Sequence, residues 1–144
     1  MNRNESDEGT NTMSKGLTFG AFEYIHIGHI NLIYRASQMC DYLIVGLSTD
    51  EYIEKKKGHK PEFNWGFRKQ MLEQIKGVEL VIPQSESFGK KEAIEHCNPN
   101  FLFVGNDWTP ETYTGEGLGV PVIYLERTLN ISSTQIRNAR ETTN

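Results

Sequence analysis

Residues 20–29 read GAFEYIHIGH, and they join two different structural patterns. The run LTFGAF at 17–22 is short and apolar, which is typical of a buried strand. Over residues 28–39, apolar side chains recur at helical spacing. We therefore predict a strand that ends near Phe22 and a helix that begins near Gly28. A strand leading directly into a helix is the first unit of an alternating α/β fold.

The same alternation continues along the chain. Short apolar runs predict four further strands, at 42–47, 78–83, 101–105 and 120–126. Helical spacing and capping residues predict further helices at 48–56, 67–76, 89–97 and 132–141. Strictly alternating units imply parallel strands with helical crossovers. The predicted fold is therefore α/β, a Rossmann-like doubly wound sheet of about five parallel strands with helices on both faces.

Length and composition are those of a single soluble domain. The chain has 144 residues, of which 37% are hydrophobic and 24% charged, and its net charge of −4 gives no general footprint for nucleic acid. Residues 1–14 are polar and without periodicity, so we predict a disordered tail before one domain at 15–144. No apolar run reaches the length of a membrane span, and the N-terminus lacks a signal-peptide core. These absences favour a cytoplasmic protein without a membrane partner.

Cysteine and lysine usage limits the chemistry further. Cys40 and Cys97 are far apart and follow helical patterns, which predicts reduced packing residues. Basic side chains cluster at the end of the helix predicted at 48–56 and in the segment that follows it, at Lys55, Lys56, Lys57 and Lys60. On an acidic chain such a cluster suits a small anion, although a solvated loop is the simpler explanation of a lysine run alone.

His26 and His29 are the candidate chemical groups of the opening stretch. In open parallel sheets, ligands bind beyond the carboxyl ends of the strands, where these histidines are predicted. Free N–H groups and the dipole of a helix start favour an anion by roughly 0.3–1 kcal/mol, and Gly28 lets a phosphate approach the backbone. A zinc site is disfavoured because it needs three or four ligands and no partner has suitable spacing. Two purely structural histidines are the remaining alternative.

Several motifs, taken in order, resemble those of glycerol-3-phosphate cytidylyltransferases, within the HxGH nucleotidyltransferase superfamily. GAFEYIHIGH resembles the GTFDxxHxGH opening of that family, and DYLIVGLSTDEY its second strand and STDE turn. FRKQMLEQIKGVELVIP resembles its R-x-x-x-L/I-E helix and third strand, VGNDW its GDDW, and RTLNISSTQIR its RTxGISTTxI. The resemblance covers about residues 16–138. Class I aminoacyl-tRNA synthetases also contain HIGH, but this chain has no room for their tRNA-binding part.

The resemblance implies a reaction, a cofactor and partners. The reaction is transfer of CMP from CTP to glycerol 3-phosphate or a close polyol phosphate, which gives CDP-glycerol and pyrophosphate. Mg²⁺ is implied as the cofactor, bound mainly through the nucleotide phosphates, so no protein metal ligands are expected. The implied partners are CTP, a small phosphorylated alcohol and a second copy of the chain in a homodimer.

The resemblance also assigns roles to individual residues. The implied catalytic residues are His26, His29, Lys57 and Arg127. Nucleotide binding is implied for Ala21, Phe22, Ile27, Gly28, Gly105, Asp107, Thr128, Ile131, Ser132, Ser133 and Thr134. Acceptor binding is implied for Lys56, Lys90, Trp108 and Arg68. The family's lysine register falls between Lys56 and Lys57, with Lys60 as a substitute. Trp108 and the SSTQ segment also have simpler explanations, as loop packing and as a helix cap.

Four positions depart from the family pattern. Glu23 stands where the family has Asp, Ala21 where it has Thr, Asn106 where it has Asp, and Asn130 where it has Gly. Loss of one charge-assisted hydrogen bond costs on the order of 1.5–3 kcal/mol. Three hypotheses follow: a glycerol-3-phosphate cytidylyltransferase; a sibling enzyme that uses ATP or another acceptor, such as ethanolamine phosphate, choline phosphate, FMN or a heptose phosphate; and a non-catalytic nucleotide-binding module.

Overall fold

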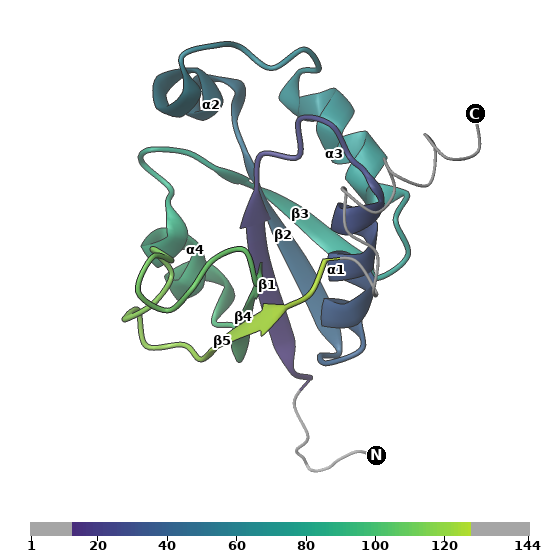
Figure 1. The fold of residues 1–144 in the computed structure, drawn as a ribbon, viewed down its shortest axis with the longest axis vertical. Helices are drawn as coiled ribbons and strands as arrows, with labels where there is room; N and C mark the ends of the chain where they lie inside the picture. Colours follow the sequence, from purple (N-terminus) through teal and green to yellow (C-terminus); the bar gives the residue numbers. More distant parts are fainter. Residues whose placement is uncertain (1–12, 128–144) are drawn as a thin grey trace, which may run out of the picture.

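Five parallel strands form one sheet in the order β3-β2-β1-β4-β5 (Figure 1). The computed structural model describes residues 13–127, so the last predicted helix and most of the predicted N-terminal tail lie outside the described residues. The strands are β1 Lys15–Gly20, β2 Tyr42–Ser48, β3 Val78–Gln84, β4 Phe101–Gly105 and β5 Val122–Leu125. This sheet confirms the predicted doubly wound α/β architecture.

Four helices within residues 13–127 connect the strands: α1 Ile27–Ser37, α2 Asp50–Lys57, α3 Trp65–Glu73 and α4 Lys90–Cys97. Local side chains define where they begin. The Thr49 hydroxyl accepts from the N–H of Tyr52 at 3.1 Å, and the Asn64 side chain accepts from the N–H of Phe67 at 2.9 Å. Each of these bonds satisfies an N–H group that the first turn of a helix leaves without a backbone partner. The Asn64 cap explains why α3 begins two residues before the predicted start at residue 67.

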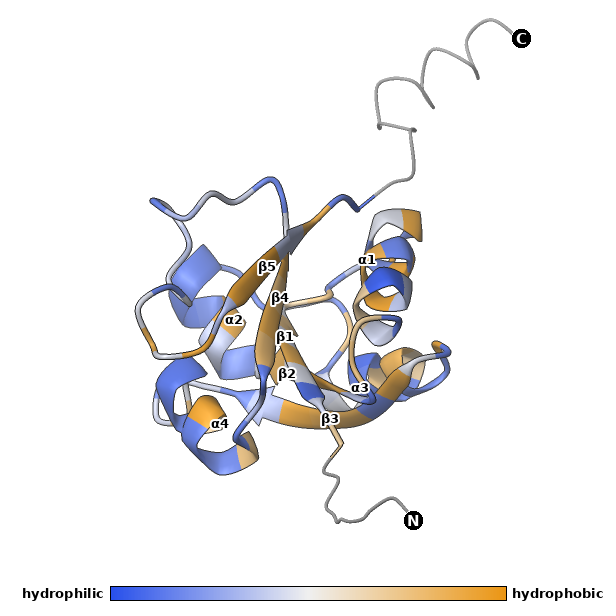
Figure 2. Cartoon of the chain, turned by 90° about the horizontal axis from the view of Figure 1, so that it is seen from below, coloured by the Kyte–Doolittle hydropathy of each residue, from blue (hydrophilic) through white to orange (hydrophobic). Residues whose placement is uncertain are grey.

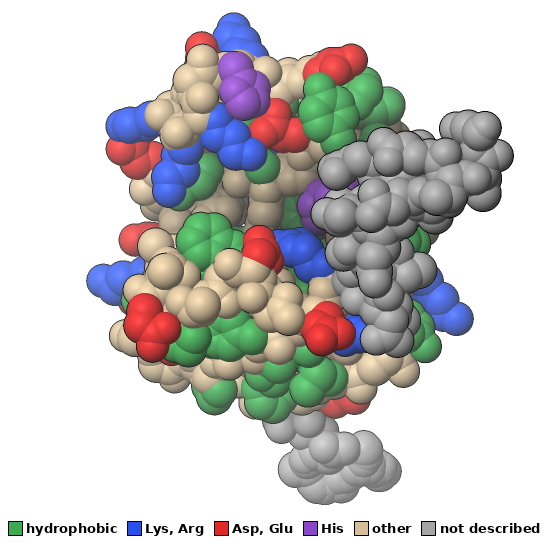
Figure 3. All heavy atoms as spheres, in the orientation of Figure 1, with side chains coloured by type: hydrophobic (Ala, Val, Ile, Leu, Met, Phe, Trp, Pro, Cys, Tyr) green, Lys and Arg blue, Asp and Glu red, His purple; other side chains and the backbone are tan. Residues whose placement is uncertain are grey.

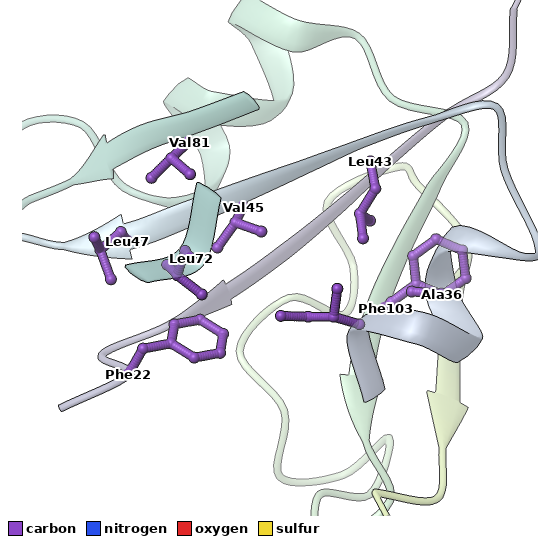
Figure 4. Close-up of a cluster of buried hydrophobic side chains, with 9 residues drawn as sticks. Phe22, Ala36, Leu43, Val45, Leu47, Leu72, Val81 and Phe103 are labelled. Carbon is purple, nitrogen blue, oxygen red and sulfur yellow. The ribbon is translucent and has the colours of Figure 1, made fainter. Parts of the chain in front are cut away.

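Helices cover the sheet on both faces (Figures 1 and 2). On one face, Ile33 and Ala36 of α1 and Leu72 of α3 pack against strand residues such as Val45 and Phe103 (Figure 4). On the other face, α4 packs Ala93 and Cys97 against a second set of strand residues, Leu17, Ile44, Ile82 and Leu102. The strands consist largely of apolar residues (Figure 2), because helices cover both of their sides.

Two of the apolar residues whose spacing predicts α3 lie on its exposed side. Phe67 and Met71, two of the residues whose spacing predicts the helix, are 45% and 40% exposed. The buried side chains of α3 are instead Arg68 and Leu72. The helix itself is therefore predicted correctly, but burial of an arginine on its inner face could not be read from apolar periodicity. No helix among residues 13–127 is long and apolar enough to span a membrane.

The strand order places a ligand-binding position at the carboxyl edge of the sheet. The chain adds β2 and β3 on one side of β1, and then β4 and β5 on the other side. The connections after β1 and β4 therefore leave the sheet toward opposite faces, which opens a crevice at this switch point. A hollow of about 620 Å³ lies there, and its lining includes residues at the carboxyl ends of β1, β2, β3 and β4 and, after β5, Arg127.

Candidate active site

The two histidines of the opening stretch lie at the start of α1, and their ring nitrogens have defined roles. The Nδ1 atom of His26 accepts from the N–H of Gly28 at 3.0 Å, and Nδ1 of His29 accepts from the N–H of His26 at 3.3 Å. A backbone N–H can only donate, so each Nδ1 must carry a lone pair. The neutral ring then has its proton on Nε2. Both histidines can therefore cap the helix with one nitrogen and donate to a ligand with the other.

The environment of His29 keeps its ring neutral. The rings of His26 and His29 stack with centroids 3.9 Å apart, and the ring of Phe22 meets His29 edge-on at 4.9 Å. Burial, together with the charges of His26 and Arg127, lowers the pKa of His29 to about 4. At neutral pH this imidazole is an uncharged hydrogen-bond donor and not a cation.

Gly28 and Phe22 shape the backbone around the histidines. A Cβ at Gly28 would lie 2.9 Å from Cε1 of His26, so only glycine lets the His26 ring fold back onto the helix start. Phe22 has φ of 47°, a left-handed conformation that a bulky side chain rarely adopts. This turn ends β1 at Gly20, two residues before the predicted end, and sends the Phe22 ring into the core beneath His29.

Basic side chains gather on the opposite rim of the hollow, at the end of α2 (Figure 3). Lys56 lies over the ring of Tyr52, with its Nζ 5.2 Å from the ring centre. Lys57 donates to a carboxylate oxygen of Glu23 at 2.8 Å, and the other oxygen of Glu23 is 3.0 Å from Nε2 of His59. The hydrogen bond from Lys57 lowers the pKa of Glu23, so this carboxylate stays ionised. Lys56 and Lys57, between which the family's lysine register falls, both line the hollow. Glu23, whose side chain is longer than the aspartate of the family pattern, links the loop after β1 to the end of α2.

Arg68, for which acceptor binding is implied, does not line the hollow. Its guanidinium group is 1% exposed and is surrounded by protein acceptors. It donates to the carbonyl oxygens of Ala21 and Ser48 at 2.8 and 2.9 Å and to that of Phe63 at 2.8 Å, and it forms an ion pair with Asp50. Arg68 therefore joins the ends of β1 and β2 to the start of α3, beneath the hollow.

Arg127 enters the hollow from the end of β5 and is oriented by the loop after β4. Its Nε donates to the Asp107 carboxylate at 3.0 Å. Gly105 leaves the space for this pair, because a Cβ there would lie 2.4 Å from Nε of Arg127 and 2.5 Å from the Asp107 oxygen. Asp107, predicted to bind nucleotide, thus holds an arginine that does line the hollow.

The face of the sheet that packs on α4 forms the other half of the hollow. Lys90 begins α4, and its Nζ lies 5.1 Å from the ring centre of Phe19 and 5.5 Å from that of Tyr113. Burial, with repulsion from Lys56, lowers the pKa of Lys90. Trp108 is 44% exposed at the rim, with its ring 6.0 Å from that of Tyr113. An ammonium between aromatic faces remains available to an anionic ligand.

The structure brings together most of the predicted site residues that it describes. Those that line the hollow are Ala21, Phe22, His26, His29, Lys56, Lys57, Lys90, Trp108 and Arg127. Ile27, Gly28, Gly105 and Asp107 are chain neighbours of lining residues. Thr128, Ile131, Ser132, Ser133 and Thr134 lie outside the described residues.

Sequence reasoning missed other lining residues, including Phe19, Ser48, Tyr52, Gln84, Tyr113 and Thr114. Ser48 and Gln84 directly follow the strands predicted at 42–47 and 78–83, and they are the last residues of β2 and β3. The strand-end rule could therefore have indicated them. Tyr113 lies in a loop without periodicity, where no comparable signal exists. Among residues 13–127, no group of three or more histidine, cysteine or carboxylate side chains is arranged to hold a metal ion.

The fold and the hollow define an α/β nucleotidyltransferase class, and comparison with known proteins specifies the family. Residues 17–139 match the model of the cytidylyltransferase-like family. The chain therefore belongs to the cytidylyltransferase-like family.

Several relatives have a known activity. The chain is 40% identical over 125 residues to the glycerol-3-phosphate cytidylyltransferase of Staphylococcus aureus, an alignment that covers 87% of this chain and 93% of that protein. It is 39% identical to the enzyme of the same name from Bacillus subtilis, over 87% of this chain and 95% of that protein. The ethanolamine-phosphate cytidylyltransferase of Mus musculus is 40% identical over 62% of this chain and 22% of its own length.

The fold also has counterparts among solved structures. A lipopolysaccharide core biosynthesis protein from Thermoplasma volcanium superposes with a TM-score of 0.66 at 21% identity, covering 83% of this chain and all of that chain (100%). A protein from Vibrio parahaemolyticus whose structure was solved as a putative nicotinate-nucleotide adenylyltransferase gives a TM-score of 0.54 at 16% identity, over 92% of this chain and 89% of that one. At these identities the likeness concerns the fold alone.

Proposed function

We propose that this protein is a cytoplasmic cytidylyltransferase that transfers CMP from CTP to glycerol 3-phosphate. The main support is identity of about 40% to glycerol-3-phosphate cytidylyltransferases over 93–95% of their length. The site is consistent with this assignment, because the histidines, lysines and arginine that line the hollow all suit phosphate groups. A cytoplasmic location suits an enzyme that consumes a nucleoside triphosphate.

In the proposed reaction, a phosphate oxygen of the acceptor attacks the α-phosphorus of CTP in line. The bond from this phosphorus to the bridging oxygen of the β-phosphate breaks, and pyrophosphate leaves with that electron pair. Negative charge accumulates on the equatorial and bridging oxygens, so catalysis depends on positioning and charge stabilisation. We assign the Nε2–H groups of His26 and His29 to donate to these oxygens, and Lys57 and Arg127 to compensate the charge of the triphosphate.

Mg²⁺ is part of this proposal as a companion of the nucleotide. The hollow fits a cation that arrives on phosphate oxygens, because Glu23 is already engaged by Lys57 and His59 and Asp107 by Arg127. When bound, Mg²⁺ would neutralise charge on the phosphates and keep much of its own water. The protein would supply the remaining positive charge through Lys56, Lys57 and Arg127.

The test is a matrix of nucleotides and acceptors. CTP or ATP is combined with Mg²⁺ and, in turn, glycerol 3-phosphate, ethanolamine phosphate, choline phosphate, FMN and a heptose phosphate, and pyrophosphate release is measured. We expect release with CTP and glycerol 3-phosphate, with CDP-glycerol identified by mass spectrometry. A different productive pair would replace this function with that of a sibling enzyme. CTP binding without turnover in any combination would identify a non-catalytic module.

We also propose that the protein acts as a homodimer. Support comes from apolar side chains on the outer sides of α1 and α3, which cover the same face of the sheet: Ile27 is 53% exposed, Tyr34 52% and Phe67 45%. Light scattering after size exclusion should give twice the chain mass for the wild type and the chain mass for a Phe67→Arg, Met71→Arg variant. A monomeric wild type at micromolar concentration would refute the dimer without affecting the proposed reaction.

A further inference from the structure

Gln84 is a buried polar side chain that faces the hollow. It is the last residue of β3, and its side chain is on the same side of the strand as Ile82, which packs in the core against α4. Pro83 between them lies on the opposite side of the strand, the side of Val81, and is itself exposed. Gln84 thus continues the row of core-facing positions beyond the end of the core, where the next space is the hollow. It is only 4% exposed, yet it lines this cavity.

The hydrogen bonds of Gln84 leave part of its amide unused. Its backbone carbonyl accepts from the N–H of Thr49 at 2.9 Å. Its side-chain oxygen lies 3.5 Å from the hydroxyl of Ser48, its register partner on β2, which is itself 6% exposed. Within residues 13–127 the amide nitrogen has no hydrogen-bond partner. Whichever way the amide is turned, one polar end has no partner among residues 13–127, although buried amides are normally paired.

The surroundings of Gln84 suit a small phosphorylated molecule. Ser48, Gln84 and Phe19 all belong to the sheet face that packs on α4, and all three line the hollow. Gly46 on β2 leaves the space that the Phe19 ring occupies, because a Cβ at Gly46 would lie 2.5 Å from this ring. The Lys90 ammonium lies over the Phe19 ring, 5.1 Å from its centre. The Lys90 ammonium, which suits a phosphate, and the neutral Gln84 amide therefore lie in the same half of the hollow.

We propose that Gln84, supported by Ser48, binds a hydroxyl group of the acceptor and thereby selects an uncharged, hydroxylated alcohol phosphate over a cationic one. This inference rests on the proposed function and names the specificity determinant of its acceptor. A hydroxyl both donates and accepts, so it pairs with either end of the amide. An ammonium group only donates, and a quaternary ammonium does neither, so each leaves part of the amide unsatisfied. Sites that hydrogen-bond a substrate hydroxyl reject analogues that lack it for this reason.

The test compares a Gln84→Met variant with the wild type on acceptors that differ by one hydroxyl. The acceptors are glycerol 3-phosphate, 3-hydroxypropyl phosphate and 2-hydroxypropyl phosphate, each offered with saturating CTP. We expect the wild type to prefer glycerol 3-phosphate by about tenfold or more in kcat/KM over at least one deoxy analogue. In Gln84→Met this preference should fall below about threefold, with KM for CTP within about twofold of the wild type.

Two controls separate recognition from a structural role. Gln70→Met makes the same change on the exposed surface of α3 and should leave the acceptor preference intact. Gln84→Met should melt at the wild-type temperature or above, because methionine needs no hydrogen bond. Gln84→Glu, which places a carboxylate in the hollow, should raise the ratio of turnover with ethanolamine phosphate to turnover with glycerol 3-phosphate.

The outcomes distinguish this inference from the function on which it rests. If the wild type does not turn over glycerol 3-phosphate, the proposed function fails and the inference falls with it. If the wild type is active and Gln84→Met keeps the wild-type preference between glycerol 3-phosphate and its deoxy analogues, Gln84 does not read the acceptor. A lowered melting temperature with an equal loss for all acceptors would also refute it, because that pattern marks a structural residue.

Discussion

His26 and His29 each use their two ring nitrogens for different purposes. Nδ1 accepts a backbone N–H at the start of α1, while Nε2 carries the proton that a phosphate oxygen can accept. The structural role, which at the level of sequence was an alternative to ligand binding, therefore leaves Nε2 of each ring available for the proposed ligand-binding role. The division also decides which substitutions are informative, since asparagine can imitate Nδ1 but not Nε2.

His29→Asn should separate capping from catalysis. The asparagine oxygen can still accept from the N–H of His26, while the outward donor is lost. We expect kcat for CDP-glycerol formation to fall by about 100- to 1000-fold, the typical cost of losing one donor to a developing charge. The melting temperature should change less than in His29→Ala, which loses the cap as well. Turnover within about threefold of the wild type would show that His29 is not catalytic.

At the scale of elements, the hollow depends on how three loops are held at the carboxyl edge of the sheet. The loop after β1 is turned by Phe22 and capped onto α1, and Arg68 joins it to the end of β2. Glu23 connects the same loop to α2 through Lys57. The groups proposed to be catalytic are thus placed by contacts between elements, and substitutions at these contacts should affect activity and stability in different proportions.

Gly28→Ala and Gly66→Ala make the same change in two helices with opposite expected results. A Cβ at Gly28 meets the His26 ring at 2.9 Å, whereas the nearest neighbour of a Cβ at Gly66 in α3 is 3.7 Å away. Gly28→Ala should displace the His26 ring and lower kcat by about tenfold or more. Gly66→Ala should keep full activity and stabilise the protein by about 0.5–1 kcal/mol, because alanine favours the helix. Equal kinetics for both variants would argue against the role of the His26 ring position.

Arg68→Met should be the most destabilising of the variants considered. It leaves the Asp50 carboxylate and the carbonyls of Ala21 and Ser48 without their shared donor. Breaking such a buried charge network costs about 3–5 kcal/mol, which urea denaturation would detect. Lys69→Met removes the neighbouring exposed pair with Glu73 and should cost no more than about 0.5 kcal/mol. A small loss for Arg68→Met would mean that Arg68 does not hold the loops together.

For the molecule as a whole, the switch point of the sheet divides the hollow into two halves. Histidines and Arg127 approach from the α1 side, and Lys90, Gln84 and Tyr113 from the α4 side. This division suits a reaction in which two phosphorylated substrates meet at one phosphorus atom. The burial that creates the hollow also couples the protonation of His29 to the stability of the entire fold.

The unfolding free energy should rise with pH between about 4 and 6.5. The folded-state pKa of His29 is about 4, against 6.5 as its ordinary value, so the unfolded chain binds one more proton in this window. The effect amounts to roughly 2–4 kcal/mol, and the pKa of Glu23, which is also lowered, adds its own loss only below about 4.5. Urea titrations at half-unit pH steps would measure the slope. His29→Asn should flatten it between pH 5 and 6.5, and an unchanged slope would assign it to other groups.

From the sequence by itself, we could predict the alternation of strands and helices, the caps of α2, and fewer than half of the residues that line the hollow. These features depend on local periodicity, on short motifs and on the rule that ligands lie at strand ends. A residue such as His26 is found in this way because its neighbours in sequence are also its neighbours in space.

Only the tertiary structure decided the partners of charged and polar side chains. Arg68 is separated by 47 residues from the Ala21 carbonyl it binds, and Glu23 by 34 residues from Lys57. No periodic pattern encodes such pairs, because they arise when separate loops meet above the sheet. The sequence predicted a phosphate site at the start of α1. Packing determined that Arg68 holds together the loops beneath the hollow and that Asp107 orients Arg127. It also determined that the partly unpaired side-chain amide of Gln84 lines the hollow.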